Sequence, residues 1–433
     1  MRFKSLLHLS GIQKVIFGAV LAAVSVGLLN AQGPGNSQGN ASVVVPDTSI
    51  EHAGDAGVRA HTNHLIRGQA NSTATAPAGE TPGSLGCVYA IPGASTTTGC
   101  PISSGTANTS GGAGVIAIVD AFDYSTAVND FYVFSNQFGL PCTRSGVPSS
   151  GSCPDQFQVV YSRGKARSNC GWAQESALDI EWAHALAPNA KIVLVLAPSN
   201  FNSDLYAAVD LASKIVQTPA AYGITGVQNP GRGEVSMSWG SGEFSSEANL
   251  DSHFTASGVV YFAASGDSGG KVIYPSASPY VVSAGGTTVN RSGGLFSSET
   301  AWSGSGGGPS QYELRPSYQN GVSLIGSMRG TPDFSFDANP YSGVSVYDST
   351  PCQGFSGWMV FGGTSVSSPA LAGIVNLAGS FAISGTAELS TIYSGISSTN
   401  FRDIISGSAG SFSAGTGWDF VTGVGSNKGL SGK

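Results

Sequence analysis

Between residues 114 and 265 the chain alternates short apolar runs with longer stretches in which apolar residues recur at helical spacing. We predict strands at 114–120, 157–162, 190–197, 234–240 and 258–265, and helices at 124–138, 172–186, 204–216 and 243–256. Strands that are apolar throughout and alternate with helices are typical of a parallel sheet covered on both faces. We therefore predict an α/β fold with a mostly parallel central sheet between two layers of helices.

The first 31 residues have the pattern of an export signal. Arg2, Lys4 and Lys14 precede the apolar stretch 15–29, and a small residue, Ala31, follows at a suitable cleavage position. A membrane anchor is the alternative, although the stretch is short for a span of ~20 residues. We expect residues 1–31 to be a signal peptide and the protein to be secreted, to the extracellular space or the periplasm.

Residues 32–85 differ in composition from the rest of the chain. They are rich in Gly, Ala, Ser, Thr, Asn and Pro, with one possible short helix near 56–69. We interpret this stretch as a linker or a short pro-segment. The main domain is expected to extend from residue 86 to residue 433.

Charged residues are scarce in this chain. They make up 10% of its 433 residues, against roughly 25% in an average domain. The net charge is −7, and there is no run of Lys or Arg. This balance argues against nucleic acid and, once the signal is removed, against membranes as partners. It also makes tolerance of acid plausible, and a monomer is the default expectation.

Six cysteines in an exported chain indicate disulfides rather than metal ligands, since no CxxC spacing occurs. Close spacing favours Cys87–Cys100 and Cys142–Cys153, which leaves Cys170 with Cys352. Six cysteines allow 15 pairings, so other connectivities stay open.

Ser365 is the candidate nucleophile. It follows Gly363-Thr364 and precedes Pro369 at the start of a small-residue apolar run. A serine hydroxyl needs a neighbouring base, which is usually a histidine. His8 lies in the signal, and three more histidines (His52, His61 and His64) lie in 32–85. His253 is expected at the N-terminal edge of the sheet, away from the active end, so His184 is the only histidine candidate.

The predicted helix 172–186 offers a second kind of base. At ~100° per residue, Glu175 and Asp179 lie about 40° apart on one face, and His184 lies on the opposite face. A solvated polar face is the ordinary interpretation of such a pair, but the surrounding residues are mostly apolar. Two carboxyl groups in a dry site share a proton, so Glu175 could act as the base with Asp179 orienting it.

Two further aspartates follow predicted strands. Asp267 lies in Ser-Gly-Asp-Ser-Gly-Gly after strand 258–265, where an ordinary turn residue is one interpretation. Asp120 ends strand 114–120 and is either a support residue near the site or simply the end of the strand. Both would lie at the carboxyl edge of a parallel sheet, where such folds bind ligands.

Several segments together resemble the sedolisins, or serine-carboxyl peptidases, from about residue 86 to residue 429. They are Gly363-Thr364-Ser365 with Pro369, the Glu175/Asp179 pair in place of a subtilisin histidine motif, and the stretches 235–240, 262–270, 274–289, 329–343 and 402–425. The resemblance implies a subtilisin-like three-layer fold. It also implies Ser365 as nucleophile, Glu175 as base and acid, Asp179 as its partner, and Asp267 in the oxyanion hole. Asp267 would have to be protonated to donate there.

The same resemblance implies two binding sites. Ser238, Trp239 and Gly240 would form a wall of the substrate cleft, where a peptide adds by strand pairing; for Trp239 an ordinary core position is the alternative. One structural Ca²⁺ ion would be held by Asp403, Asp419 and the carbonyls of Ile404, Gly415 and Gly417.

These observations predict a secreted, acid-acting serine-carboxyl peptidase that hydrolyses peptide bonds through an acyl-enzyme on Ser365. One alternative is a subtilisin-type hydrolase that uses His184. Another is an exported binding protein on a scaffold that has lost its activity.

Overall fold

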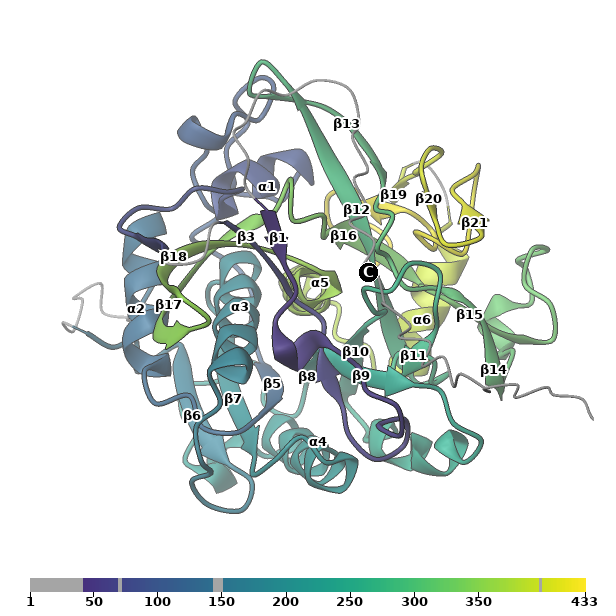
Figure 1. Cartoon of the computed structure of the whole chain (residues 1–433), viewed down its shortest axis with the longest axis horizontal. Helices are drawn as coiled ribbons and strands as arrows, with labels where there is room; N and C mark the ends of the chain where they lie inside the picture. Colours follow the sequence, from purple (N-terminus) through teal and green to yellow (C-terminus); the bar gives the residue numbers. More distant parts are fainter. Residues whose placement is uncertain (1–41, 69–71, 143–150, 397–398) are drawn as a thin grey trace, which may run out of the picture. The chain divides into compact units, whose positions relative to one another are not determined.

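A large, mostly parallel sheet lies at the centre of the computed structural model, which describes residues 42–68, 72–142, 151–396 and 399–433 (Figure 1). Its strand order is β19-β22-β16-β12-β10-β8-β5-β7-β6, and β13 pairs with β12. The pairs from β6 to β22 are parallel, whereas β13 and β19 join antiparallel. The bounds are β5 Val115–Ala121, β6 Phe157–Tyr161, β7 Lys191–Ala197, β8 Gly233–Met237, β10 Val259–Ala264, β12 Val281–Ser292, β13 Leu295–Ala301, β16 Phe334–Asp337, β19 Phe401–Arg402 and β22 Ser426–Asn427.

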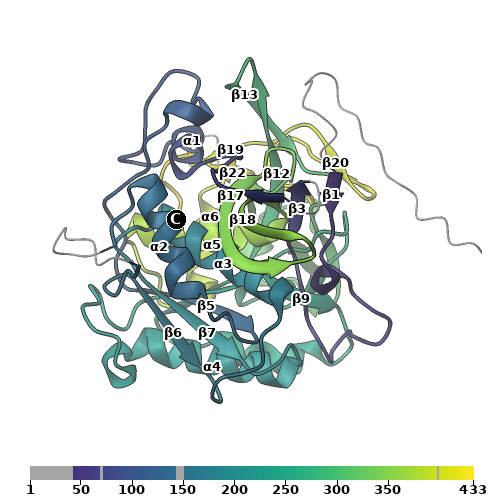
Figure 2. The same ribbon diagram turned by 60° about the vertical axis from the view of Figure 1, so that its left-hand side comes forward.

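Helices cover both faces of this sheet, because alternate residues of its buried strands point to opposite sides. On β5, Ile116 and Ile118 belong to one apolar core with α2, α3 and α5. Val115 and Ala117 belong to another core with α4. Figure 2 shows α4 on one side of β5, β6 and β7, with α2, α3 and α5 on the other. The bounds are α2 Ala127–Phe138, α3 Cys170–Leu186, α4 Asn202–Gln217 and α5 Thr364–Ala378. The predicted three-layer architecture is confirmed.

A second sheet is built partly from residues 42–74. Its order is β1-β3-β18-β17, and β4 also pairs with β18. A small third sheet has the order β11-β9-β2. In Figure 1 the purple segment runs down the middle of the view from β3 toward β9. The bounds are β1 Ser42–Val44, β2 His61–Thr62, β3 Leu65–Gly68, β4 Ser72–Ala74, β9 Trp239–Gly242, β11 Ile273–Tyr274, β17 Val344–Cys352 and β18 Phe355–Gly362.

The remaining elements are short and lie at the edges of these layers. They are α1 Pro82–Val88, α6 Gly385–Ser394, β14 Gly308–Leu314, β15 Met328–Thr331, β20 Ser408–Ala409, β21 Phe412–Ser413, and the 3₁₀ helices η1 Asp47–Ser49, η2 Ile102–Ser104, η3 Pro219–Tyr222, η4 Glu247–Phe254 and η5 Ser317–Gln319.

Two predicted helices are wrong. The stretch 243–256 contains the 3₁₀ helix η4 instead of an α-helix. It is rich in Ser, Asn and Asp, whose side chains compete with helical backbone bonds. The helix expected near 56–69 is absent, because β2 and β3 in that stretch pair with strands of the main domain. The predicted strand 234–240 is broken at Ser238, between β8 and β9.

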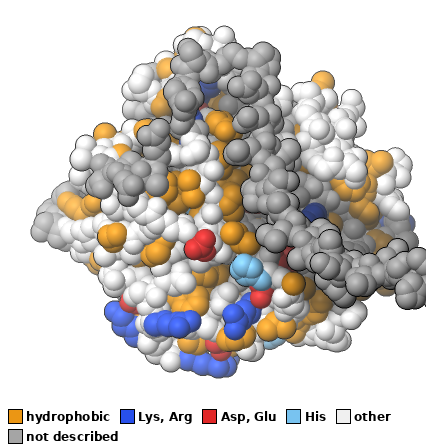
Figure 3. Space-filling view, viewed as in Figure 1, with side chains coloured by type: hydrophobic (Ala, Val, Ile, Leu, Met, Phe, Trp, Pro, Cys, Tyr) orange, Lys and Arg blue, Asp and Glu red, His pale blue; other side chains and the backbone are white. Residues whose placement is uncertain are grey.

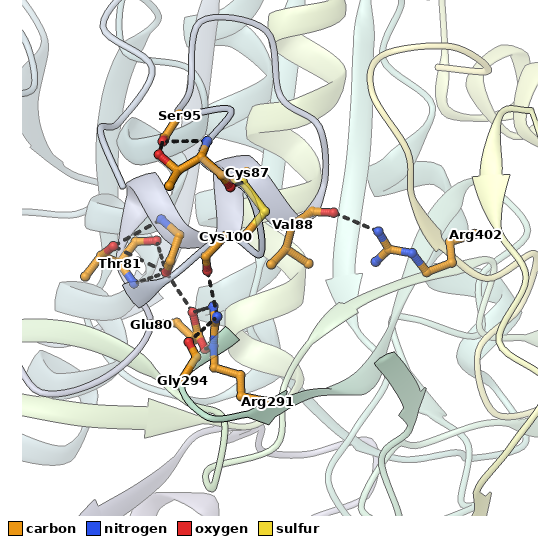
Figure 4. The surroundings of a disulfide bond; sticks show 11 residues. Glu80, Thr81, Cys87, Val88, Ser95, Cys100, Arg291, Gly294 and Arg402 are labelled. Atoms are coloured by element: carbon orange, nitrogen blue, oxygen red, sulfur yellow. Dashed lines mark hydrogen bonds and ion pairs between the residues drawn. A yellow bond between two sulfur atoms is a disulfide. The ribbon is translucent and has the colours of Figure 1, made fainter. Parts of the chain in front are cut away.

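All three expected disulfides are present: Cys87–Cys100, Cys142–Cys153 and Cys170–Cys352. The first closes the loop after α1, and Figure 4 shows an ion pair beside it. Arg291, which lies on β12, forms this ion pair with Glu80 and also donates a hydrogen bond to the Cys100 carbonyl at 2.6 Å. The bridge and the ion pair together join the start of the domain to the central sheet.

The surface carries few charges, as the composition predicts. On the face shown in Figure 3, apolar and uncharged polar side chains predominate, and the Lys and Arg side chains gather mainly near one end. Within the described ranges, no helix has the length and apolar character needed to cross a membrane. The predicted signal peptide, residues 1–31, lies outside the described residues.

Candidate active site

Ser365 lies in the first turn of α5, directly after β18. The turn between the two elements needs Gly363, whose φ of +98° is unfavourable for residues with a Cβ. Amides in the first turn of a helix have no partner within that helix. The Ser365 N–H therefore points outward and donates to the carbonyl of Asn63 at 3.0 Å.

Pro369 gives this helix a second unusual feature. It lies inside α5 and has no N–H, so the carbonyl of Ser365, four residues earlier, lacks its usual helical donor. The hydroxyl of Ser238 donates to that carbonyl at 3.3 Å and to Asp179 Oδ1 at 2.8 Å. Ser238 thereby links the segment that carries the nucleophile to the acidic pair on α3.

Glu175 and Asp179 are fully buried on the face of α3 that meets this site. Burial raises the pKa of Asp179 well above its usual value, and the charges of Asp120 and Glu175 raise it further. Burial likewise raises the pKa of Asp120, with Glu175 adding to the effect. Asp120 is therefore part of the acidic cluster with Glu175 and Asp179. From the sequence alone, the place of Asp120 relative to the site was left open. These burial and charge effects favour the protonated form of Asp179.

Asp267 follows β10 and contacts the start of α5. Its Oδ1 accepts hydrogen bonds from the N–H and the hydroxyl of Thr364, both at 2.8 Å. Its Oδ2 is buried and has no hydrogen-bond partner among the described residues. Burial raises the pKa of Asp267 to about 8, so the carboxyl group is protonated at acid and neutral pH. A protonated Oδ2 can donate one hydrogen bond into the cleft.

The chain's own residues 61–64 lie against this site, where the resemblance implies a substrate cleft. Strand β2 pairs antiparallel with β9, with His61 opposite Gly240 and Thr62 opposite Trp239. The N–H of Asn63 donates to the carbonyl of Ser238 at 3.1 Å and to Glu175 Oε2 at 3.2 Å. A Cβ placed on Gly363 would lie 2.2 Å from the Asn63 carbonyl oxygen and 2.5 Å from Asp267 Oδ2. That carbonyl thus lies beside both expected oxyanion donors.

The three residues expected to form the substrate wall contact this segment through their backbone. Ser238 accepts from Asn63, and Trp239 and Gly240 are paired with β2. The Trp239 side chain is fully buried, and its indole N–H donates to the Val119 carbonyl at 2.7 Å. The Trp239 side chain is therefore a core residue, whereas its backbone pairs with the chain's own β2.

Sequence reasoning missed two residues of this site: Asn63, described above, and His64. Its Nδ1 lies 2.8 Å from Glu175 Oε2, and the side chain is fully buried. The sequence showed His64 only as part of a polar leader, and nothing local indicated contact with a residue more than 100 positions away. His184 packs its ring on Phe131 of α2 instead, with centroids 4.6 Å apart, and burial lowers its pKa to about 3.

The expected calcium ligands gather in one loop near the C-terminus. The N–H of Gly417 donates to the Asp403 carboxylate at 3.1 Å, and the N–H of Gly415 donates to Asp419 Oδ2 at 3.1 Å. Within the described ranges, no three His, Cys, Asp or Glu side chains form a metal-binding group. The expected set consists of two carboxylates and three backbone carbonyls, a donor type that suits Ca²⁺.

Comparison with known proteins gives significant matches. No family model matches the sequence. Kumamolisin from Bacillus sp. (strain MN-32) is 32% identical over 293 residues, which is 59% of this chain and 49% of the relative. Sedolisin from Pseudomonas sp. (strain 101) is 33% identical over 230 residues, 44% of this chain and 38% of the relative. The sequence is thus similar to those of the sedolisins.

The matches span about half or less of these relatives of the sedolisin group. A solved structure of Pseudomonas sedolisin, described as a serine-carboxyl proteinase complexed with two molecules of pseudo-iodotyrostatin, aligns with a TM-score of 0.60 and 24% identity. The alignment covers 81% of this chain and 96% of that one. It supports the subtilisin-like fold that the resemblance implied.

Proposed function

We propose that this chain is a serine-carboxyl peptidase that hydrolyses peptide bonds in proteins or peptides through an acyl-enzyme on Ser365. One observation carries the proposal. A peptide segment, residues 61–64, lies along β9 with the Asn63 carbonyl accepting from the Ser365 N–H and lying beside Asp267 Oδ2. This is the arrangement that an oxyanion hole requires.

The reaction follows from these positions. The Ser365 hydroxyl, which now donates to the Ser238 carbonyl at 3.2 Å, turns to Glu175 and loses its proton as Oγ bonds to the carbonyl carbon. The Ser365 N–H and protonated Asp267 donate to the oxyanion. Glu175 passes the proton to the leaving amine as the C–N bond breaks, and water then hydrolyses the ester by the same route.

Asp179 and Ser238 act as positioning residues in this scheme. The Ser238 hydroxyl holds Asp179 Oδ1 at 2.8 Å, and the proton on Asp179 limits the negative charge beside Glu175. Glu175 can then carry the charge that a base needs, although three carboxyl groups share one buried site. Activity at acid pH follows, because both Asp179 and Asp267 must stay protonated.

A structural Ca²⁺ ion is part of the proposal. Asp403, Asp419 and the carbonyls of Ile404, Gly415 and Gly417 would hold it, and the glycine amides already draw both carboxylates to one loop. The bound ion would supply a cross-link between the two ends of that loop. It takes no part in the chemistry.

The remaining predictions also stand as proposals. Residues 1–31 would be a cleaved signal peptide, residues 32–85 a linker or short pro-segment, and residues 86–433 the peptidase domain. The protein would be secreted and act as a monomer on protein or peptide substrates. Nucleic acid and membranes would not be its partners.

Hydrolysis of a fluorogenic peptide from about pH 3 to about pH 8 tests the assignment. Glu175→Gln should lower turnover by roughly 10²–10⁴, the usual contribution of a general base. Ser365→Ala should lower it by roughly 10⁶, the usual cost of removing a serine nucleophile. Glu181→Gln is a matched control, because Glu181 is buried on the same helix but accepts from Tyr347 N–H instead of contacting the site. It should keep near-wild-type turnover.

The alternatives give different results in the same assay. Activity that peaks at neutral pH and survives Glu175→Gln but not His184→Gln would indicate the histidine-dependent enzyme. Absence of hydrolysis at every pH, with a folded protein, would indicate a binding protein on an inactive scaffold.

A further inference from the structure

A short loop after β6 concentrates positive charge. It carries Arg163, Lys165 and Arg167, whereas the whole chain of 433 residues has only 19 Lys and Arg. The loop joins the carboxyl end of β6 to α3, and β6 belongs to the parallel part of the central sheet. Parallel sheets bind ligands outside this edge. The positive charge therefore lies at the same edge of the sheet as the candidate active site.

Asp123, which follows β5, holds this loop in place. Its N–H donates to the Arg167 carbonyl at 3.0 Å. Its carboxylate accepts a hydrogen bond from the Tyr161 hydroxyl at 2.6 Å and pairs with Lys165 at 3.3 Å. The backbone of Arg167 is therefore fixed against the end of β5, so its side chain starts from a defined position.

The three cations of this loop differ in how their charge is used. Arg163 and Lys165 each pair with an aspartate, at 3.1 and 3.3 Å. The Arg167 guanidinium forms no ion pair with any residue in the described ranges, and it lies over the Phe122 ring, 5.5 Å from the ring centroid. An aromatic face supports a guanidinium without neutralising it. The charge of Arg167 is therefore available to a ligand.

A hollow of about 300 Å³ lies beside this side chain. The main domain contributes five residues to its lining: Phe122, Arg167, Asn169, Trp172 and Asn200. Asn169 caps α3, because its Oδ1 accepts from the N–H of Trp172 at 3.2 Å. The amino end of a helix favours negative charge nearby. Arg167 and the start of α3 thus make this wall of the hollow electropositive.

Ala60 borders the hollow where a substrate residue would lie. The Asn63 carbonyl occupies the oxyanion position, so Ala60 corresponds to the fourth residue before the cleaved bond. Its N–H donates to the Asn200 carbonyl at 3.0 Å, and the Asn200 side chain donates to its carbonyl at 2.8 Å. The Ala60 side chain packs in the same apolar cluster as Phe122. A longer side chain at this place would extend into the hollow that Arg167 lines.

The charged side chains around the hollow come from two parts of the chain. Asp47, Asp55 and Arg59 belong to the segment 42–68, whereas Arg167 belongs to the main domain. A substrate that lies along β9 takes the place of this segment. Arg167 is then the charged side chain of the main domain that meets it.

We propose that Arg167 is a specificity-determining residue, which makes the peptidase prefer substrates with Asp or Glu as the fourth residue before the cleaved bond. This inference rests on the proposed peptidase function and adds the class of its substrate, an acidic peptide. The guanidinium has several N–H donors arranged to match a carboxylate. The walls of the hollow limit the access of water to this pair, which strengthens it.

Two fluorogenic peptides that differ only at this fourth residue, with Glu in one and Gln in the other, test the preference in the full chain. Mass spectrometry of the products identifies the cleaved bond. At about pH 5 the glutamate is mostly ionised, because its usual pKa is about 4.3. We expect wild type to have a kcat/KM about 3–10-fold higher for the Glu peptide, somewhat more than an exposed ion pair gives. Added salt should reduce this ratio.

Three variants identify the residue responsible. Arg167→Gln should bring the ratio for the two peptides close to unity. Arg167→Glu should reverse the preference, so that a peptide with Lys at the fourth position becomes better than the Glu peptide. Arg163→Gln is the matched control, because Arg163 lies in the same loop but pairs with Asp204 and does not line the hollow. It should keep the wild-type ratio.

The position in the peptide has its own control. Glu and Gln are compared again at the second residue after the cleaved bond, where the peptide has passed Ser365 and left the hollow behind. We expect no preference there. An equal preference at both positions would mean that the overall charge of the peptide is recognised and that the assignment to Arg167 is wrong.

The outcomes distinguish this inference from the proposed function. If wild type cleaves the Glu and Gln peptides equally well, or if the preference persists in Arg167→Gln, the inference is wrong while the peptidase function stands. If wild type cleaves no peptide, the proposed function is wrong. Binding of the two labelled peptides to Ser365→Ala, measured by fluorescence polarisation, then decides the inference, because equal affinities would overturn it and tighter binding of the Glu peptide would support it.

Discussion

The protonation state of one buried oxygen, Asp267 Oδ2, determines the pH range in which the proposed active site can work. Oδ1 is already committed to Thr364, whereas Oδ2 lies against Gly363 beside the peptide carbonyl. Ionised, Oδ2 would repel a developing oxyanion. Protonated, it can donate, and burial keeps the pKa of the group near 8. In the proposed peptidase this residue would therefore favour turnover at acid and neutral pH.

Two substitutions at Asp267 should separate donation from charge. Asp267→Asn keeps an acceptor for Thr364 and places an amide donor at the other position. Asp267→Ala removes the donor, and the loss of one oxyanion donor costs roughly 10²–10³ in turnover. We expect activity in the order wild type, Asn, Ala at acid pH. Above about pH 8 wild type should fall more steeply than the Asn form, because only the carboxyl group ionises.

Turnover against pH for the three proteins on one peptide is the measurement. Equal turnover in wild type and the Ala form would mean that Asp267 is only a turn residue. The Ser365 N–H would then serve the oxyanion without it.

Among single residues, the sequence predicted those whose position follows from the local sequence pattern. Ser365 follows a glycine turn at a helix start, and Glu175 and Asp179 are one helical turn apart, so their types and spacing were visible. Asn63 and His64 were not, because their significance comes from pairing with β9 and Glu175, more than 100 residues away. Asp120 was placed only when the sheet brought it beside α3.

The loop from Asp403 to Asp419 is an element that a bound cation would stabilise. It is rich in Gly and Ser, and its short strands β20 and β21 pair only with each other. The two carboxylates are bonded to glycine amides of the same loop, and burial raises the pKa of Asp419. A bound cation would favour the ionised form of Asp419 and offset the cost of its burial.

Calcium should therefore raise the melting temperature by several degrees. An ion at 100 times its Kd stabilises the folded state by about 2.7 kcal/mol through mass action. Asp403→Ala should abolish the difference between calcium and chelator. Asp210→Ala, which removes an exposed carboxylate paired with His253, should preserve it. An identical melting temperature for wild type in calcium and in chelator would eliminate the site.

Among whole elements, the predicted strands and helices of the central sheet were found because their apolar periodicity is strong. The errors at 243–256 and 56–69 have physical causes. The first stretch has polar residues that bond to their own backbone, so it tightens into η4. The second has no apolar face of its own, and distant strands decide its conformation.

Among the described residues, several carboxyl groups are buried but take part in no ion pair. Burial raises the pKa of Glu313, Glu388 and Asp348 to about 7 and that of Glu247 to about 9. Each has one buried oxygen with no hydrogen-bond partner in the described part of the chain. The folded protein therefore holds protons that the unfolded chain, with carboxyl pKa values near 4, has already lost.

Stability should fall as pH rises. Groups with raised pKa values stabilise the folded state fully below about pH 4 and lose that contribution as pH passes 7 to 9. We expect the melting temperature of the Ser365→Ala protein, which cannot digest itself, to fall by roughly 10 °C between about pH 4 and about pH 8. Scanning calorimetry across that range is the measurement.

Asp348→Asn is the matched test of the cause. The Asn side chain can still accept from Thr350 N–H, which Asp348 does at 2.7 Å, and it cannot ionise. It should reduce the dependence on pH and stabilise the protein near pH 8. A melting temperature that rises from acid to neutral pH would contradict this account.

The order in which the chain is synthesised determines when β3 can pair with its neighbour in the sheet. Its partner β18 is made roughly 300 residues later, so this pairing waits until most of the chain exists. Strand β18 leads directly into Gly363 and Ser365. The strand that receives the segment and the nucleophile thus leave the ribosome together. The place where a substrate of the proposed peptidase would bind is therefore filled as soon as it is formed.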